Sequence, residues 1–249
     1  MVLSFFEEFP TKSSLDRINL IPWPTKLYLA AQNIPKFNSI RSGIKNKNVK
    51  ECIYWPILSR TEGYWISPFS EQRALARIFG ELDGKKIPIM LDLELPTRQN
   101  PWLYCTQRIH FWDNKRLIAD FIRNYAGEVY LAEYYPEGKW KEKVLGCLGL
   151  HYVSPKVKVI KMMYHSLHHF NESFVREELK RGKQEFGNNF MVALGTIAPG
   201  IHGNEPVLSA AQLEQDLRLC KESGIKEVII FRLGGLNKNY LKVLQSYAL

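Results

Sequence analysis

The stretch Ile87-Pro88-Ile89-Met90-Leu91-Asp92-Leu93-Glu94 carries most of the information about this fold. It is an apolar run that ends in two acids and is closed by Pro96. Side chains alternate between the two faces of a strand, so Asp92 and Glu94 share a face with Met90. This pattern predicts a buried strand whose carboxyl end presents two carboxyl groups on one side.

Short apolar runs of the same kind recur along the whole chain, with helical patterns between them. This alternation is typical of consecutive strand–helix–strand units and a parallel sheet. The predicted strands are Val2 to Phe6, Lys26 to Ala31, Glu51 to Trp55, Ile87 to Asp92, Glu128 to Glu133, Val157 to Tyr164, Phe190 to Thr196 and Glu227 to Arg232.

Helix boundaries can be predicted from residues whose side chains cap a helix start. Gly224 has the residue type that commonly ends a helix. The predicted pairs of cap and helix are Ser70 before Glu71 to Phe79, Asn114 before Lys115 to Tyr125, and Ser209 before Ala210 to Ser223.

Eight strand–helix units in 249 residues predict a single (β/α)8 TIM barrel that spans residues 1–249 as one domain. The alternative fold is an open, doubly wound sheet. The sequence contains no linker and no low-complexity tract that would separate two domains.

The chain has a formal net charge of +9, which favours anionic partners and disfavours self-association, so we expect a monomer. No apolar run is long enough for a transmembrane segment. The basic run Lys45 to Lys50 is short, and no nucleic-acid-binding motif is present, so we expect no specific nucleic acid partner. The compartment stays open, because an internal protein and one whose leader was removed both fit this sequence.

The four cysteines are Cys52, Cys105, Cys147 and Cys220, and their wide spacing predicts buried, unpaired thiols. The cluster His165, His168 and His169 has a spacing that metal ligands can use. No further metal-binding motif accompanies it, so we expect no metal and no cofactor.

Active sites of such barrels lie at the carboxyl ends of the strands, where several acids occur in this sequence. Asp92 and Glu94 are the first candidates, because two close carboxyl groups raise the pKa of one of them and make it a proton donor. Alternatively, Asp92 caps a turn and Glu94 is solvated. Glu133 ends the next predicted strand. It is either a third catalytic candidate or an ion-pair partner of Arg232. Either Glu7 or Glu8, after the first strand, must point toward the barrel axis.

Aromatic side chains gather near the same strand ends, and flat rings stack on the C–H faces of sugars. Trp65 lies in a long loop, where we expect it on the surface as a platform for a sugar. Core packing is the alternative for several of these rings. With the polar candidates, the predicted substrate-binding residues are Tyr164, Trp65, Trp55, Tyr28, Tyr135, Arg232 and Glu8.

Glycines follow the last two predicted strands, in Gly195 to Gly200 and in Arg232 to Asn237. Barrels that bind phosphorylated substrates place the phosphate on backbone N–H groups in these loops. The glycines therefore favour a phospho-sugar site near Gly200, Gly234 and Gly235, unless they only form tight turns.

The Asp-x-Glu after the fourth strand resembles barrel glycoside hydrolases, chiefly the chitinase-like family 18 and the lysozyme-like family 25. The resemblance to family 18 implies that Glu94 is the acid/base and that Asp92 assists an N-acetyl group of the substrate. A Met-x-Tyr ends the sixth strand in that family, which implies that Tyr164 hydrogen-bonds the N-acetyl oxygen. Met90 and His165 stand where that family usually has aspartates, so Glu133 or an acid of the first strand stays open as second carboxylate.

These observations together predict an enzyme that cleaves a carbohydrate substrate by carboxylate general acid/base catalysis. Two alternatives are a non-catalytic barrel that binds glycans or polyanions, and the phospho-sugar enzyme described above.

Overall fold

A computed structural model describes residues 1–135 and 138–248, without the side chain of Lys139. Its eight strands follow one another in chain order and form a closed barrel. The predicted (β/α)8 barrel is thereby confirmed, and the alternative of an open doubly wound sheet is wrong.

Each predicted strand overlaps an observed strand, and the differences are confined to the ends. The observed strands are β1 (Val2–Glu7), β2 (Thr25–Ala31), β3 (Val49–Pro56), β4 (Ile89–Leu93), β5 (Val129–Tyr134), β6 (Val157–Met162), β7 (Phe190–Gly195) and β8 (Glu227–Phe231).

Helices lie between the strands and after the last one. They are α1 (Lys12–Asp16), α2 (Ile34–Gly43), α3 (Gln72–Leu82), α4 (Leu103–Thr106), α5 (Phe111–Asn124), α6 (Lys139–Cys147), α7 (Glu172–Phe186), α8 (Ala210–Glu222) and α9 (Lys238–Gln245), with 3-10 turns η1 (Arg17–Leu20), η2 (Arg108–His110), η3 (Gly187–Asn189) and η4 (Leu233–Gly235). Within the described part of the chain, none of them is both long and apolar enough to cross a bilayer.

Only one of the three predicted helix caps acts as one. The Ser209 hydroxyl accepts the N–H of Gln212 at the start of α8, as predicted. Ser70 lies outside α3, and its hydroxyl donates to the Trp65 carbonyl instead. Asn114 is wrong as a cap, because it lies inside α5, which begins three residues earlier than its own position. Its amide donates to the carbonyls of Pro68 and Ser70 at 3.0 and 3.1 Å.

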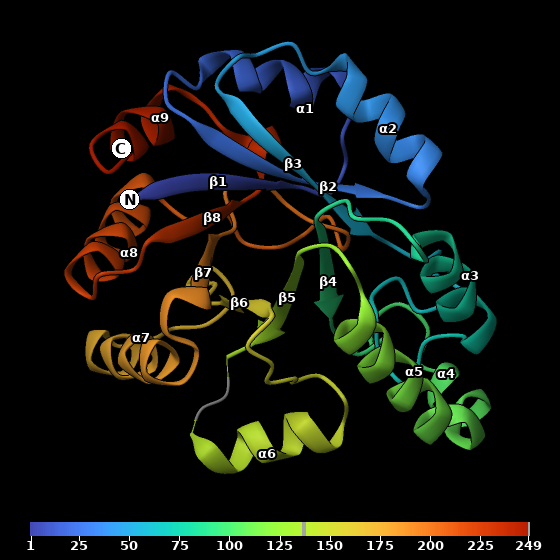
Figure 1. Cartoon of the computed structure of the whole chain (residues 1–249). Coiled ribbons are helices and arrows are strands. Elements are labelled where there is room, and N and C mark those ends of the chain that lie inside the picture. The colour runs from blue at the N-terminus through green and yellow to red at the C-terminus, as the bar shows by residue number, and fades with distance from the viewer. Residues whose placement is uncertain (136–137, 249) are drawn as a thin grey trace. The chain divides into compact units, whose positions relative to one another are not determined.

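The chain divides into two compact units, and the single-domain assignment stays a prediction. The first unit comprises Met1–Ala30, Ser39–Ile53 and Ile160–Leu249. Within it, β1 pairs in parallel with β2 and with β8, and β8 also pairs with β7 (Figure 1).

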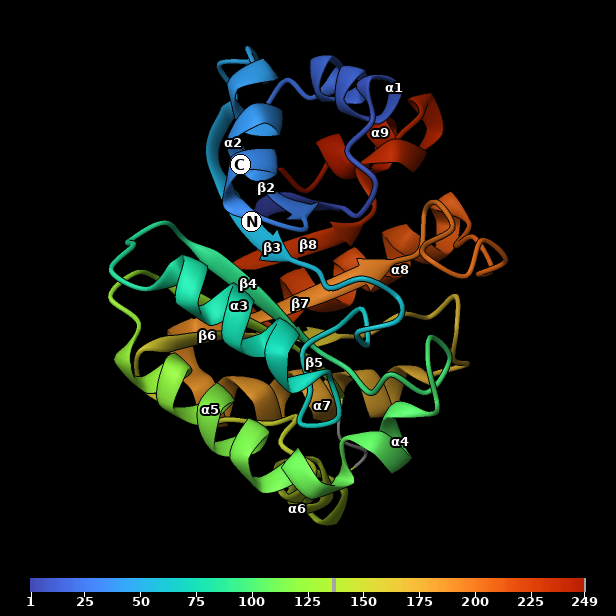
Figure 2. The ribbon, with the colours of Figure 1, turned by 90° about the vertical axis from the view of Figure 1, so that its right-hand side faces the viewer.

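The second unit comprises Ala31–Asn38 and Tyr54–Val159. Its central feature is the parallel pair β4 and β5, in which all five residues of β4 are buried. Helices α3 and α5 run side by side (Figure 2) and are joined by the stacked rings of Phe79 and Phe121, whose centroids lie 4.2 Å apart.

The cysteine prediction is correct for pairing and partly wrong for burial. All four thiols are free. Cys220 is buried and Cys52 is half-buried, but Cys105 and Cys147 are exposed. Both exposed cysteines lie on helices, Cys105 on α4 and Cys147 at the end of α6.

Asn114 offers a test of this packing, because its fully buried amide joins α5 to the loop before α3. Replacing it by Ala leaves two buried carbonyl groups without their donors, so we expect Asn114→Ala to lower the free energy of unfolding by about 1–3 kcal/mol. Urea denaturation measures this change. Asn124→Ala, at an exposed position of the same helix, should change it by less than about 0.5 kcal/mol. Equal effects of the two substitutions would contradict the assigned role of Asn114.

Candidate active site

Asp92 and Glu94 lie where the buried strand β4 ends, and the register with β5 determines their neighbours. Asp92 pairs with Ala132 and Leu93 pairs with Glu133. Residues paired in a parallel ladder point to the same face, and the next residue points to the other. Tyr134 therefore projects on the face of Asp92 and Glu94, and its hydroxyl donates to Glu94 Oε2 at 2.8 Å.

The three side chains form an acidic cluster, defined as Asp92, Glu94 and Tyr134. Burial raises the pKa of Glu94, and hydrogen bonds from Tyr134 and with Asp92 partly offset this rise. Burial and the neighbouring acids also raise the pKa of Tyr134, so its hydroxyl stays protonated and donates. Burial beside a second carboxyl group therefore favours the protonated form of Glu94 more than water does.

The contact between the two carboxyl groups limits their chemistry. Two carboxylates that flank a glycosidic bond lie about 5–9.5 Å apart, depending on the stereochemical outcome. A hydrogen-bonded pair is much closer than that. Asp92 and Glu94 can thus act together on one side of a bond, as proton donor and supporting carboxyl group, but not as acid and base on opposite sides.

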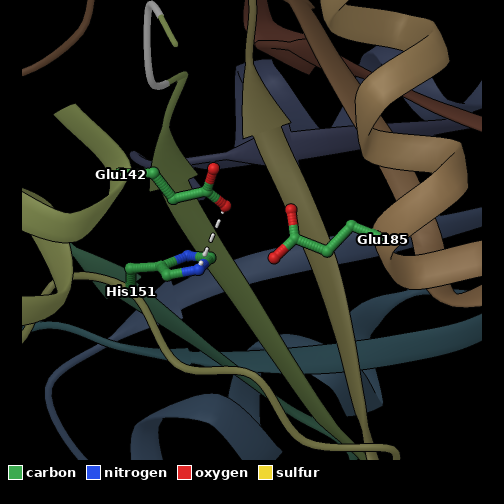
Figure 3. Close-up of side chains that lie close together, drawn as sticks. All are labelled: Glu142, His151 and Glu185. Atoms are coloured by element: carbon green, nitrogen blue, oxygen red, sulfur yellow. Dashed lines mark ion pairs between the residues drawn. The ribbon is translucent and has the colours of Figure 1, made fainter. Parts of the chain in front are cut away.

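The structure does not bring Glu133 into the acidic cluster. The register places its side chain on the face of Leu93, away from Asp92. There its fully buried carboxylate lies 2.8 Å from His151 Nδ1 and accepts the N–H of Tyr152 at 3.3 Å. Nε2 of the same imidazole lies 3.3 Å from Glu142 Oε1, as the dashed line in Figure 3 marks. The suggested ion pair of Glu133 with Arg232 stays a prediction.

The predicted aromatic platform of the second unit is mostly covered. Trp65 is only 8% exposed and packs edge-on against Tyr64, with ring centroids 5.4 Å apart. The expectation that a loop position would expose this ring is wrong, because the loop folds over β4: the N–H of Ile66 donates to the Asp92 carbonyl at 2.9 Å. Trp55, near the end of β3, is also buried, whereas Tyr135 directly follows β5 and is half-buried.

In the first unit, Arg232 binds an acid of the first strand. Its Nη1 lies 3.0 Å from Glu7 Oε1, and the N–H of Gly234 donates to Glu7 Oε2 at 2.7 Å. Burial raises the pKa of Glu7, and the charge of Arg232 and the backbone N–H groups of Phe9 and Gly234 counteract this rise. Glu7 and Arg232 thus hold β1 and the turn after β8 together, with both oxygens of Glu7 engaged.

The geometry around the glycine loops disfavours a phosphate. The Gly234 N–H that a phosphate would use already donates to Glu7. At Gly200, the position of an added Cβ lies 2.9 Å from Glu8 Oε2 and 3.1 Å from Glu205 Oε1, so two acids border this point. At Gly235 the same position lies 1.9 Å from the Ile197 carbonyl oxygen, so this glycine permits close backbone packing.

Tyr28 and Tyr164, the remaining predicted aromatic residues, belong to a row of rings in the first unit that also contains Phe6 and Phe231. Tyr28 packs edge-on against Phe6, Phe6 lies near Phe231, and Phe231 lies near Tyr164, with centroid distances of 5.2, 6.3 and 5.7 Å. Tyr28 is fully buried, and its hydroxyl donates to Glu227, the first residue of β8. The Tyr28 hydroxyl therefore points to the amino end of the strands. The prediction that Tyr28 lies near the carboxyl ends is wrong. Tyr164 is half-buried and lies two residues after the end of β6.

His165 follows Tyr164 and connects the loop after β6 to α8. Its Nδ1 lies 2.8 Å from Asp216 Oδ1 and its Nε2 lies 2.8 Å from the Phe170 carbonyl oxygen. A carbonyl oxygen and a carboxylate both only accept hydrogen bonds. Both ring nitrogens of His165 must therefore donate, which makes the imidazole a cation. The hydrogen bond to Asp216 is the main cause that raises the pKa of His165, against the effect of its burial.

Tyr134, His151 and the pair His165–Asp216 are the contacts that the sequence analysis did not identify. Tyr134 could have been found, because strand alternation places it on the face opposite to Glu133. The partners of the two histidines come from distant parts of the chain, and no local pattern indicates them.

Comparisons with known proteins give a fold and no family. No protein-family model matches this sequence, and no curated protein matches it either. Among solved structures, the chain is similar to the glycoside hydrolase domain of PgaB (BpsB) from Bordetella bronchiseptica. That match has a TM-score of 0.59 and 12% identity, and it covers 100% of this chain and 98% of the other.

Two further solved structures are similar over the whole chain. A chitinase from Chromobacterium violaceum matches with a TM-score of 0.56 and 8% identity, over 99% of this chain and 98% of that one. The spore cortex-lytic enzyme SleL of Bacillus cereus matches with a TM-score of 0.59 and 11% identity, over 100% of this chain and 74% of that one. At these identities the likeness concerns the fold alone, which is a (β/α)8 barrel.

The charged form of His165 predicts a pH-dependent stability. Because its pKa is raised in the folded state, its contribution is fully present below the unfolded value of about 6.5 and is lost as the pH rises through the folded value. We expect the urea midpoint to fall over this interval in the unmodified protein. The fall should be smaller in Asp216→Asn, which lacks the carboxylate.

His169→Gln serves as the matched control, because His169 is exposed in the same loop. Its urea midpoint should follow the pH as in the unmodified protein. A profile for Asp216→Asn that coincides with that of His169→Gln would refute the assignment.

Proposed function

We propose that this protein is a glycoside hydrolase in which Glu94 is the general acid. The observation that carries the proposal is the acidic cluster, in which burial raises the pKa of the partly buried Glu94 and the Tyr134 hydroxyl donates to its carboxyl group. A carboxylic acid that stays protonated near neutral pH is what cleavage of a glycosidic bond requires.

In the proposed reaction, Glu94 gives its proton to the glycosidic oxygen while the bond from that oxygen to the anomeric carbon breaks. The positive charge that develops on the sugar ring is stabilised by the carboxyl group of Asp92. Water then adds its hydroxide to the anomeric carbon and returns its second proton to Glu94, which restores the enzyme. The leaving sugar keeps the first proton as its new hydroxyl group.

The closeness of Asp92 to Glu94 indicates where the nucleophile comes from. Asp92 and Glu94 cannot flank the glycosidic bond, and Glu133 points to the other face of β4 and β5. Neither Asp92 nor Glu133 therefore lies opposite Glu94. We propose that an acylamino group of the substrate acts as internal nucleophile, oriented by Asp92, as the resemblance to family 18 implies. Its carbonyl oxygen bonds to the anomeric carbon as the glycosidic bond breaks, and this new bond breaks in turn when water adds to the same carbon. Tyr164 stays a proposed ligand of that group.

The fold comparisons support the proposal without identifying the substrate. The similar structures are called a glycoside hydrolase domain, a chitinase and a spore cortex-lytic enzyme. Barrels of this kind carry their chemistry at the carboxyl ends of the strands, and Glu94 directly follows β4.

Glu94→Gln tests the assignment of the acid. Glutamine keeps the shape of the side chain but cannot donate a proton to a leaving group, so we expect the rate of hydrolysis to fall by about 10²–10⁴-fold. Release of reducing ends is to be measured on a panel of oligosaccharides with either a 2-acetamido or a 2-hydroxyl group. Cleavage confined to the 2-acetamido sugars is expected.

Glu128→Gln is the matched control, because Glu128 is an exposed acid that precedes β5, at the opposite end of the strand from Tyr134. It should retain the unmodified rate. Full activity of Glu94→Gln on a substrate that the unmodified enzyme cleaves would refute the proposal, and equal cleavage of 2-hydroxyl sugars would refute the internal nucleophile alone.

Tyr134→Phe tests how the pKa of Glu94 is set. The Tyr134 hydroxyl lowers this pKa by donating to the carboxylate, so its removal should raise the pKa further. The alkaline limb of the kcat–pH profile, where the acid loses its proton, should therefore move to higher pH in Tyr134→Phe. A shift of that limb to lower pH would contradict the proposed donor role.

A further inference from the structure

Three large apolar side chains of the second unit are almost fully exposed within one short segment. Ile109 is 77% exposed, Trp102 is 73% exposed and Trp112 is 71% exposed. We call these three residues the tryptophan face. Among the other residues that the structure describes, the most exposed large apolar side chains are Trp140 on α6, at 74%, and Val153, at 64%.

The segment that carries the tryptophan face is held in place from its inner side. It comprises the short helix α4, the turn η2 and the start of α5. Leu103 is buried, and the ring of Phe111 packs on Phe69 with centroids 4.9 Å apart. The anchored neighbours keep the three exposed side chains directed outward, so their exposure is a property of a folded segment.

The segment that carries this face is basic. Residues 95–112 contain no aspartate or glutamate, while Arg98 and Arg108 are both exposed. In the second turn of α5, the Lys115 ammonium lies 5.6 Å from the Trp112 ring centroid and Arg116 is exposed. Asp113 is the one acid in residues 95–116. Apolar rings bordered by arginine and lysine match a partner that is apolar inside and anionic at its surface.

We propose that the tryptophan face docks this protein on the surface of an anionic lipid membrane. Trp102, Ile109 and Trp112 enter the boundary between headgroups and acyl chains, and the surrounding arginines bind lipid phosphates. The contact is peripheral. It is independent of the chemistry proposed for Glu94, because no residue of the acidic cluster takes part.

The shape of the face favours lipid over other partners. Sugar rings stack on flat aromatic faces, and Ile109, the most exposed of the three, offers no such face. A folded protein partner would need a hollow for each protruding side chain. A fluid interface envelops protruding side chains without a preformed hollow, and tryptophan is enriched at that depth.

Sedimentation with vesicles tests the proposal. The unmodified protein is mixed with vesicles of phosphatidylcholine alone or with about one third phosphatidylglycerol, at low and at high salt. We expect binding to the anionic vesicles that weakens as salt rises, because the Lys and Arg contacts are screened. Trp102→Ala with Trp112→Ala should lower the partition coefficient by about tenfold or more, since two rings lose their burial.

Trp140→Ala is the matched control, because it removes an equally exposed tryptophan of the same unit and leaves the charge unchanged. It should bind as the unmodified protein does. Far-ultraviolet circular dichroism verifies that all variants are folded. Arg98→Gln with Arg108→Gln should weaken binding to the anionic vesicles several-fold and leave binding to neutral vesicles unaltered.

Three results would overturn the proposal. The first is no binding of the unmodified protein to the anionic vesicles. The second is binding that persists undiminished in the double tryptophan variant, which would mean that net charge alone drives it. The third is concentration-dependent self-association that the same double variant abolishes, in the absence of vesicle binding, which would assign the face to a second copy of this chain.

Discussion

The candidate chemistry depends on the register between β4 and β5. Because Asp92 pairs with Ala132, the residue two positions further on β5 shares the face of the two acids, and that residue is Tyr134. A shift by one position would exchange Tyr134 for Glu133. Three carboxyl groups would then share one face, where their mutual repulsion would have no hydroxyl donor to reduce it. The observed register instead gives Glu94 a neutral donor and sends Glu133 to His151 on the other face.

Much of this organisation could be predicted from the sequence, for physical reasons that differ between elements. The run before Asp92 is apolar and strictly alternating, so both the strand and the shared face of the two acids follow from local geometry. Ser209 also acts locally, since a cap needs only its own side chain and the next turn. By contrast, Asn114 has the residue type of a cap, but its amide donates to two carbonyls of a loop more than forty positions earlier. No local sequence pattern predicts that contact.

The site residues show the same contrast between features set by local geometry and features set by long-range packing. Glu94 could be identified from its position after a buried strand. Trp65 and Tyr28 could not be placed, because exposure depends on which segments pack over a ring. The pairing of Arg232 with Glu7 joins residues from the two ends of the sequence, whereas the sequence suggested Glu133 as the partner of Arg232. Residue type and strand parity therefore predict which groups can act together, and only tertiary packing decides which of them do.

The pairing of β1 with β8 also constrains the order in which the polypeptide can acquire its structure during synthesis. Chains emerge from the ribosome from the amino end, and domains form as their segments become available. The ladder between β4 and β5 joins segments about forty residues apart, so it can assemble early. Glu7 lacks its native partner until Arg232 has emerged, and β1 lacks β8, one of its two neighbouring strands, until then. A nascent chain halted before that point thus exposes an unpaired strand edge with an uncompensated carboxylate, a state in which chaperones would be expected to engage it.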